Sequence, residues 1–429
     1  MNEEAVKLEQ ILKPTPFYEV LSVFGRAVYF PQGIVAQSLQ AAKGSYAGNA
    51  TAGVALEHGH HMILSCIKEA LPTLDVDRSV SYAPTAGVLE LRAAWRDALV
   101  EKNPLLAHKT FTLPIVTAGL THALSLASDM FVDPGDRMVI FQPSWDNYEL
   151  IFGVQHRANI TGCPMFEDGR LAVNALYEMI MHCPENKIIV LLNFPNNPTG
   201  YTPTVEEMGK LVDALIACAD EGKRLVVITD DAYFGLFHTP EAAKFSIFQD
   251  LCDAHERIIA VKCDAATKEA MVWGFRIGFI TYGNKEMSSQ VMNAMIQKTM
   301  GIIRATVSSS SHVGQNLLLE ALRDGRFKTE TAAVAAEMAE RRDRVRIALK
   351  GHRSDEDLLR PLPFNSGYFF SLVCKGNPEE LRQYLLENHG IGTISLEGRY
   401  LRIAYSGVDR EVIGSVIDTV YRGARLLWK

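Results

Sequence analysis

The chain has 429 residues, of which 48% are hydrophobic and 22% are charged. This length suffices for two or three domains of roughly 100 to 200 residues, and the composition argues against disordered, collagen-like and membrane-embedded proteins. Lysine and arginine together number 43 against 50 acidic residues, giving a net charge of -7, which offers no general attraction to nucleic-acid phosphates. We therefore expect a globular protein that does not bind nucleic acid.

The amino terminus and the cysteines indicate the compartment. The first ten residues carry three glutamates and lack the basic start and apolar run of a secretory signal. The longest uncharged span, residues 110–128, is interrupted by Pro114, Gly119 and His122 and so predicts strand, turn and helix instead of a membrane span. The seven cysteines are widely spaced without a CxxC pair, which is typical of reduced thiols. These features predict a cytoplasmic protein without a membrane partner.

Between about residues 86 and 300, short apolar runs alternate with longer segments of helical period, which predicts a mostly parallel sheet covered by helices. Segment 206–221 is amphipathic, and Thr204 stands three residues before Glu207, the spacing of a capping box that begins a helix. The expected strands are residues 113–117, 137–141, 187–193, 225–229, 258–262 and 276–281.

From about residue 310 the pattern changes and predicts a second, smaller α+β domain. It comprises long helices at 311–322 and 329–350, short strands at 367–374 and 401–406, and a final helix. The first fifty or so residues include a loop-like stretch at 30–33 and are expected to pack with this domain. The predicted organisation is an amino-terminal segment (1–55), a large ligand-binding domain (56–310) and a small domain (311–429).

Polar residues follow four of the predicted strands, and ligands bind beyond the carboxyl ends of strands in open parallel sheets. Each segment alone is typical of a turn, a loop acid or a surface lysine. Their joint occurrence, with an arginine eight residues after the lysine, indicates a binding site. A lysine amine forms a Schiff base with an aldehyde, an acid keeps a pyridine nitrogen protonated, and a helix amino terminus with an arginine binds phosphate. The set predicts a pyridoxal 5'-phosphate site at Gly119-Leu120-Thr121, Pro195 to Gly200, Asp230 to Tyr233 and Thr267-Lys268.

From about Tyr82 to Gly407 the sequence resembles the fold type I pyridoxal-phosphate enzymes, in particular the class I/II aminotransferases nearest to the aspartate and aromatic subfamily. The most specific block is Thr267-Lys268 followed by Gly274-Phe275-Arg276-Ile277-Gly278. The resemblance implies an α/β fold type I transferase. Its large domain would hold a mostly parallel seven-stranded sheet covered by helices, and its smaller α+β domain would combine the carboxyl-terminal part with the amino-terminal segment.

The resemblance also implies roles for single residues. Lys268 would carry the cofactor and Arg276 would bind its phosphate. Asp230 would contact the pyridine nitrogen, and Tyr233 and Asn197 the phenolic oxygen. Further cofactor contacts are expected from Gly119, Leu120 and Thr121 in the phosphate loop, from Thr267 through its hydroxyl, from Trp145 by stacking on the ring, and from Tyr82, which would reach the phosphate of a neighbouring subunit.

Substrate contacts follow from the same resemblance. Arg402 would bind the substrate α-carboxylate together with Asn197, beside Trp145. Arg304 would pair across a homodimer with the distal carboxylate of a dicarboxylic substrate, although a surface or interface ion pair is the alternative. Gly33 would approach the substrate carboxylate, with a plain turn as the alternative. Like Tyr82, Arg304 implies a homodimer with shared active sites.

Two positions depart from the family pattern. Ala265 stands where the family often has a serine three residues before the lysine, so one phosphate contact must be weaker or come from elsewhere. Tyr148 stands where aspartate-type members have a histidine three residues after the stacking tryptophan. The hydrogen bond that this histidine gives to the aspartate therefore does not carry over from the resemblance.

The predicted activity is transfer of an amino group between an L-amino acid, dicarboxylic and/or aromatic, and a 2-oxo acid by a ping-pong mechanism, with Lys268, Asp230 and Tyr233 as catalytic residues and without a metal ion. Another enzyme with the same cofactor, such as a C–S or β-lyase, a β-decarboxylase or a synthase, would use the same residues. A non-catalytic regulator on this fold would need a basic DNA-binding domain, for which the short acidic amino terminus leaves no room. A nicotinamide dehydrogenase is disfavoured because no GxGxxG follows a strand.

Overall fold

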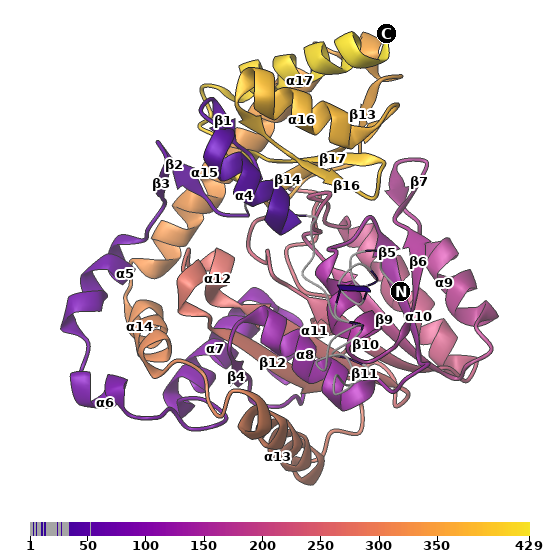
Figure 1. Ribbon diagram of the computed structural model, residues 1–429. Coiled ribbons are helices and arrows are strands. Elements are labelled where there is room, and N and C mark those ends of the chain that lie inside the picture. Colours follow the sequence, from indigo (N-terminus) through magenta and orange to yellow (C-terminus); the bar gives the residue numbers. More distant parts are fainter. Residues whose placement is uncertain are drawn as a thin grey trace.

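The computed structural model describes residues 34–51 and 53–429, with a few isolated residues nearer the amino terminus. Gly33 and the loop-like stretch 30–33 lie outside the described residues. Figure 1 shows two lobes: the carboxyl-terminal elements and the first described helix, α4 (Ile34–Gly44), form the upper lobe, and the central part of the chain forms the lower lobe.

Within the described residues, the largest sheet has seven strands in the order β4-β12-β11-β10-β9-β5-β6. Strand β12 runs antiparallel to both of its neighbours, β4 and β11, and the other strand pairs of this sheet are parallel. The predicted fold class is confirmed, and each predicted strand of this region lies in the sheet. The edge strand β6 was not predicted because it is half-exposed and lacks a continuous apolar run. The strands are β4 Ile115–Thr117, β5 Arg137–Gln142, β6 Asn159–Pro164, β9 Lys187–Asn193, β10 Arg224–Asp230, β11 Ile258–Ala265 and β12 Gly278–Gly283.

Helices surround this sheet, and the capping box predicted for one of them is present. Thr204 Oγ1 accepts from the backbone N–H of Glu207 at 3.2 Å, and the Glu207 carboxylate accepts from the backbone N–H of Thr204 at 2.8 Å. The helix therefore begins where the sequence indicated. The helices of this region are α5 Ser65–Ala70, α6 Val76–Val80, α7 Leu89–Lys102, α8 Leu120–Phe131, α9 Val173–His182, α10 Val205–Asp220, α11 Phe248–Leu251, α12 Ala266–Glu269, α13 Ser289–Thr306 and α14 His312–Arg323. The same region also contains two short antiparallel hairpins, β2 Leu56–Glu57 with β3 His60–His61 and β7 Phe166–Glu167 with β8 Arg170–Leu171.

The upper lobe contains a four-stranded antiparallel sheet in the order β13-β14-β17-β16. The first described residues pack with it: β1 pairs with β15, and the Gln37 side chain exchanges two hydrogen bonds with the backbone of Ser395 (3.1 and 2.7 Å). The elements are β1 Gly48–Asn49, β13 Leu359–Pro361, β14 Phe369–Cys374, β15 Ile391–Gly392, β16 Ile394–Leu396, β17 Tyr400–Ala404, α15 Phe327–Lys350, α16 Pro378–His389 and α17 Ile413–Trp428.

Two main hydrophobic cores meet along α15. Val334 and Met338 belong to the core of the large sheet, whereas Val345 belongs to the core of the upper lobe. Helix α14 packs against α5, α6 and α7 of the lower lobe. The change of core therefore falls inside α15, and the predicted domain limits at residues 55 and 310 stay a prediction.

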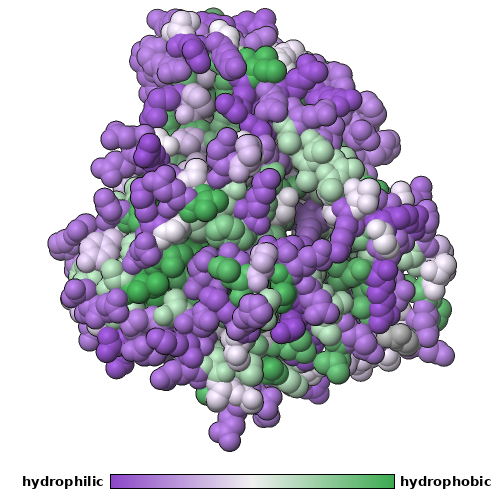
Figure 2. All heavy atoms as spheres, turned by 180° about the vertical axis from the view of Figure 1, so that it is seen from behind, coloured by the Kyte–Doolittle hydropathy of each residue, from purple (hydrophilic) through white to green (hydrophobic). Residues whose placement is uncertain are grey.

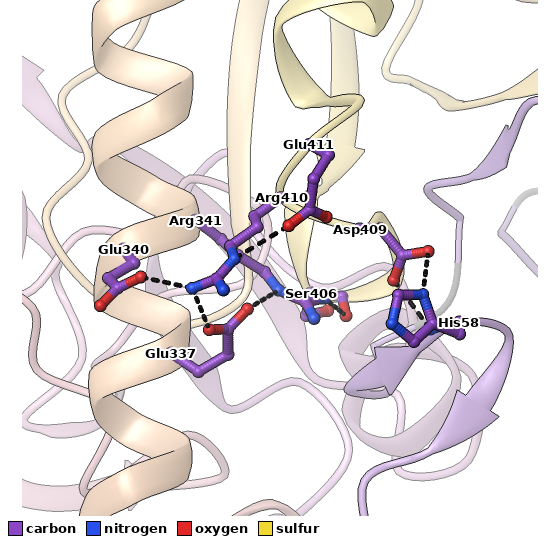
Figure 3. A network of polar contacts seen from close by, with 8 residues as sticks. All are labelled: His58, Glu337, Glu340, Arg341, Ser406, Asp409, Arg410 and Glu411. Atoms are coloured by element: carbon purple, nitrogen blue, oxygen red, sulfur yellow. Dashed lines mark hydrogen bonds and ion pairs between the residues drawn. The ribbon is translucent and has the colours of Figure 1, made fainter.

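A polar network joins α15 to the loop after β17 (Figure 3). Arg341 contacts the Glu337 carboxylate at 2.8 Å and donates to the backbone carbonyl of Ser406 at 2.9 Å. Because Ser406 lies four residues after Arg402, the network holds the end of the strand that carries Arg402. Its other members are His58, Glu340, Asp409, Arg410 and Glu411.

Figure 2 shows the opposite face of the molecule, where polar side chains cover most of the upper lobe and apolar side chains form separate patches over the lower lobe. Across residues 34–51 and 53–429, no helix has the length and apolar character needed to cross a membrane.

Candidate active site

A cavity of about 280 Å³ lies at the carboxyl ends of the parallel strands, and Phe369 and Arg402 line it from the upper lobe. Ligand sites in open parallel sheets occur at this edge because the loops after the strands converge there. The structure brings together most of the residues that the sequence singled out. Those that line the cavity are Leu120, Thr121, Trp145, Asn197, Asp230, Tyr233, Thr267, Lys268, Arg276 and Arg402.

Lys268 reaches the cavity from α12, the short helix that follows β11. Its Nζ atom lies 4.8 Å from the centre of the Tyr233 ring. Burial lowers the pKa of the Lys268 amine to about 8, although the nearby Asp230 carboxylate opposes this shift. An amine with this pKa is available in its neutral form close to neutral pH, as a nucleophile or a base requires.

Asp230 ends strand β10 and is 2% exposed. Its Oδ2 atom accepts from the Tyr148 hydroxyl at 2.7 Å, and its Oδ1 atom accepts from the backbone N–H of Ala232 at 3.0 Å. Burial raises the pKa of Asp230 to about 6, while the hydrogen bond from Tyr148 favours the ionised form. Asp230 therefore has a hydrogen bond in place of the one that a histidine gives in aspartate-type members, and here the donor is the Tyr148 phenol.

The turn at residues 197–200 is tied to the Asp230 strand. The Asn193 side chain accepts from the backbone N–H of Asn197 at 2.8 Å and donates to the backbone carbonyl of Asp230 at 2.9 Å. Asn193 also lines the cavity, although the sequence reasoning treated it only as the end of a strand. It fixes the two neighbouring strand ends relative to each other.

Gly119, Arg276 and the amino terminus of α8 form a positively charged cradle. Gly119 has a φ of 88°, and a Cβ at this position would lie 2.4 Å from Arg276 Nη2. Only glycine allows the arginine to lie so close to the loop. The first turn of α8 contains no acidic residue, so its backbone N–H groups and the guanidinium favour an anion here. Ala265 provides no hydroxyl, but Thr267 lines the cavity.

Arg402 lies on β17 and is 2% exposed. It donates to Asn197 Oδ1 at 2.9 Å and to the backbone carbonyl of Thr51 at 2.8 Å, and its guanidinium carbon lies 4.5 Å from the Phe369 ring centre. Burial lowers the pKa of Arg402 to about 10. Its guanidinium lines the cavity, where it can donate to a carboxylate. Its Nε donor is buried and has no partner among the described residues.

These residues fit pyridoxal phosphate. The cradle at Gly119 and Arg276 suits a phosphate, the Asp230 carboxylate suits a protonated ring nitrogen, and the Lys268 amine suits an aldehyde. The Arg402 guanidinium, which lines the same cavity, suits the substrate carboxylate.

Comparison with known proteins decides the family. Residues 51–420 match the family described as aminotransferase class I and II. The chain belongs to this family. It is therefore an enzyme, an aminotransferase, and its family is generally pyridoxal-phosphate-dependent, so the resemblance seen in the sequence is confirmed. The lyase and regulator alternatives are not favoured.

Known relatives of this aminotransferase agree with the assignment. It is 29% identical over 319 residues to a mitochondrial aspartate aminotransferase of Dictyostelium discoideum, covering 70% of each chain. It is 27% identical over 351 residues to an aromatic aminotransferase of Arabidopsis thaliana, covering 76% of this chain and 78% of the relative. Its fold is similar to that of an aminotransferase from Anaerococcus prevotii, with a TM-score of 0.82, 23% identity, and coverage of 94% and 97% of the two chains.

Two predicted site residues, Tyr82 and Arg304, are not brought to the cavity of the aminotransferase chain, and Gly119 adjoins the cavity through Arg276 without lining it. Tyr82 is 92% exposed, and Arg304 lies in the exposed last turn of α13, where it donates to the Ser308 hydroxyl. Neither is among the described residues that line the cavity. Gly33 lies outside the described residues.

Several cavity residues were missed by sequence reasoning. Trp273 lies within the predicted block between Lys268 and Arg276, and its buried indole N–H has no partner among the described residues. Its place inside that block is the one signal that could have identified it. The others come from segments that only the fold brings near: Ile34, Ser38, Thr51, Gly53 and Phe369.

Proposed function

We propose that this aminotransferase binds pyridoxal 5'-phosphate through Lys268 and transfers an amino group from an L-amino acid to a 2-oxo acid in two half-reactions. The observation that carries the proposal is the convergence of the Lys268 amine, the Asp230 carboxylate and the Arg402 guanidinium on one cavity. When bound, the cofactor supplies an aldehyde that takes up the substrate amine and a pyridinium ring that accepts the electrons of the Cα–H bond.

Lys268 would act first as the attachment point and then as the base. Once the substrate amine takes the place of Lys268 on the cofactor, the freed Lys268 amine would be able to remove the substrate Cα proton and deliver it to the carbon that carried the aldehyde, a task for which a pKa of about 8 is suitable. Asp230, held by Tyr148, would keep a proton at the ring nitrogen. Tyr233, whose ring faces Lys268, would donate to the phenolic oxygen, because burial raises the pKa of its hydroxyl and keeps it protonated.

Arg402 would orient the substrate through its α-carboxylate. The guanidinium is held by Asn197 and Thr51 and lines the cavity. A planar guanidinium can bind a carboxylate through two parallel hydrogen bonds, which fixes the plane of the substrate as well as its position. Every amino acid and 2-oxo acid substrate carries this group, so Arg402 would serve both half-reactions.

For the substrate side chain we propose a dicarboxylic and/or aromatic amino acid. Trp145, Trp273 and Phe369 give the cavity large apolar walls that suit an aromatic side chain. The aspartate and aromatic aminotransferases among the relatives support the same two classes. A distal carboxylate would need a cation from Arg304 of a second subunit, since Arg304 does not line the cavity of its own chain in the described structure.

A homodimer would complete the site. Tyr82 is exposed at 92% beside other exposed apolar residues, Val76 at 69%, Val80 at 77% and Leu89 at 63%, a concentration that suits an interface. In a symmetric dimer, Tyr82 and Arg304 of each chain could reach the other chain's cavity. The cytoplasmic location stays a prediction.

The proposal is tested by incubating the purified protein with pyridoxal phosphate, reducing with borohydride and locating the adduct by peptide mass spectrometry. We expect a coloured protein with the adduct on Lys268. A panel of amino acids should then convert the visible absorbance to that of the amine form of the cofactor and release a 2-oxo acid. A colourless protein without an adduct contradicts the proposal, and release of a fragment other than a 2-oxo acid would favour a lyase.

A further inference from the structure

A buried charge network lies beneath the proposed active site, on the face of the sheet opposite Asp230. We define it as Asp231, Lys262, Asp264 and Trp95. Lys262 is fully buried and forms ion pairs with Asp231 and, at 3.5 Å, with Asp264. Trp95 donates its indole N–H to Asp264 Oδ2 at 3.2 Å. None of these side chains lines the cavity within the described residues.

The pairing of strands β10 and β11 explains where these side chains point. Asp230 is paired with Cys263, so Lys262 and Asp264, its neighbours along β11, project from the opposite face. Asp231 follows Asp230 and also turns to that face, where it meets Lys262, while its backbone N–H donates to the Cys263 carbonyl at 2.9 Å. The network therefore restrains the segment that carries Asp230 without touching the cavity.

A second link restrains the segment that carries Lys268. Glu269, the next residue, forms an ion pair with Lys102 at the end of α7. Lys102 Nζ lies 5.3 Å from the ring centre of Trp95, which is also on α7 and stacks on Phe279 at 4.2 Å. Helix α7 is thus connected to both segments, the one next to Asp230 and the one next to Lys268.

The physical cost of this arrangement indicates a role. Burying three charges is unfavourable unless they are paired, and apolar residues of similar size often stabilise a protein as well or better. Burial alone would lower the pKa of Lys262, but the charges of Asp231 and Asp264 raise it, so the cation is retained. Stability alone does not explain such a network. What the network does provide is a fixed orientation of the paired side chains and of the segments that carry them.

Resting on the proposed function, we propose that Lys262 is a positioning residue: the network it centres sets the separation between the Asp230 carboxylate and the Lys268 amine. Both must contact opposite ends of one rigid cofactor ring, so the spacing of the two segments has to match that ring. Misplacement of a catalytic group by about 1 Å can lower the rate by as much as 10²-fold.

The test compares Lys262→Met with Lys223→Met. Lys223 is also a buried lysine, 7% exposed, but it donates to the carbonyls of Cys183 and Glu185 at the far end of the strands, so it controls for loss of a buried cation alone. We expect both variants to melt at a lower temperature than the parent. Only Lys262→Met should lower kcat, by about tenfold or more with KM within about threefold, and shift the pH midpoint of the cofactor absorbance.

A folded Lys262→Met protein with the parent's kcat and absorbance midpoint would overturn the proposal. If that variant does not fold, Asp264→Asn is judged by the same two readouts, since it keeps the shape and the acceptor for Trp95. Parental values would then overturn the proposal, and a shifted midpoint with lowered kcat would support it. The parent is examined first: a colourless parent contradicts the proposed function, whereas a coloured parent with unaffected variants removes only the network.

Discussion

The predicted site residues fall into two groups, which differ in whether the fold of one chain places them at the cavity. Lys268, Asp230 and Arg402 converge on a single cavity, where hydrogen bonds from the same chain hold Asp230 and Arg402. Tyr82 and Arg304 are exposed and do not line that cavity in the described structure. The difference teaches that one chain alone gathers the residues proposed for the reaction chemistry, whereas the roles predicted for Tyr82 and Arg304 would need a second chain. The following predictions separate the two groups.

The largest effect is expected for Lys268→Ala. Transamination should fall by at least about 10³-fold, because both the attachment point and the base are lost, and the visible absorbance of the bound cofactor should disappear. The measurements are steady-state kinetics and an absorbance spectrum of the purified variant. Turnover at the parental rate would remove Lys268 from the mechanism.

The second largest loss of activity is expected for Arg402→Gln. It should lower kcat/KM by about 10²-fold or more for every substrate, since all share the α-carboxylate and loss of one partner of a buried pair typically costs roughly 3 kcal/mol. Colour and cofactor binding should be retained, because Arg402 does not contact the cradle. A loss confined to one substrate class would contradict this role.

Arg304→Ala should have a selective effect. With glutamate, kcat/KM should fall by about tenfold or more, because a carboxylate is left without its cation, whereas with phenylalanine it should change little. Mixing this variant with Lys268→Ala chains provides the control, because a shared site predicts that activity with glutamate returns in the mixed dimer that combines one intact Arg304 with one intact Lys268. Equal losses for both substrates would exclude Arg304 from recognition.

The smallest effect is expected for Tyr148→Phe, which removes one hydrogen bond and keeps the ring. Hydrogen bonds to charged groups contribute about 1.5 to 3 kcal/mol, so the pKa of Asp230, about 6 in the parent apoprotein, should rise by roughly one to two units. Protonated Asp230 cannot pair with a protonated ring nitrogen, so cofactor affinity falls as pH drops through this pKa. The fall should therefore begin at a higher pH in the variant, as measured by cofactor titration between about pH 5 and 9. An unchanged pH dependence would show that Tyr148 does not control Asp230.

The raised pKa of Asp230 also determines how the stability of the apoprotein changes with pH. The folded pKa of Asp230 lies above its ordinary value of 3.8, so the apoprotein binds a proton here more readily than the unfolded chain does. The contribution of this group is therefore fully present below about pH 4 and is lost as the pH rises through about 6. Bound cofactor reverses the preference, because its ring nitrogen favours the ionised carboxylate.

Local signals accounted for much of the fold. The apolar runs that became β9 and β10 were identified because strands buried on both faces have continuous hydrophobic sequences. Thr204 and Glu207 marked the start of α10 because a capping box needs only two residues three positions apart. Strand β6 was not predicted because a half-exposed edge strand carries no continuous hydrophobic sequence.

The chain's own pattern determined the fold class, the family and the residues gathered at the strand ends, because strand periodicity, turn chemistry and the lysine-to-arginine spacing are local properties. Only the tertiary structure decided that Tyr148 holds Asp230, that Trp273 and Phe369 wall the cavity, and that Lys262 pairs with Asp231 beneath it. These contacts join segments that are distant in the sequence, 82 residues for Tyr148 and Asp230 and 31 for Lys262 and Asp231, and which segments meet depends on how strands pair and helices pack.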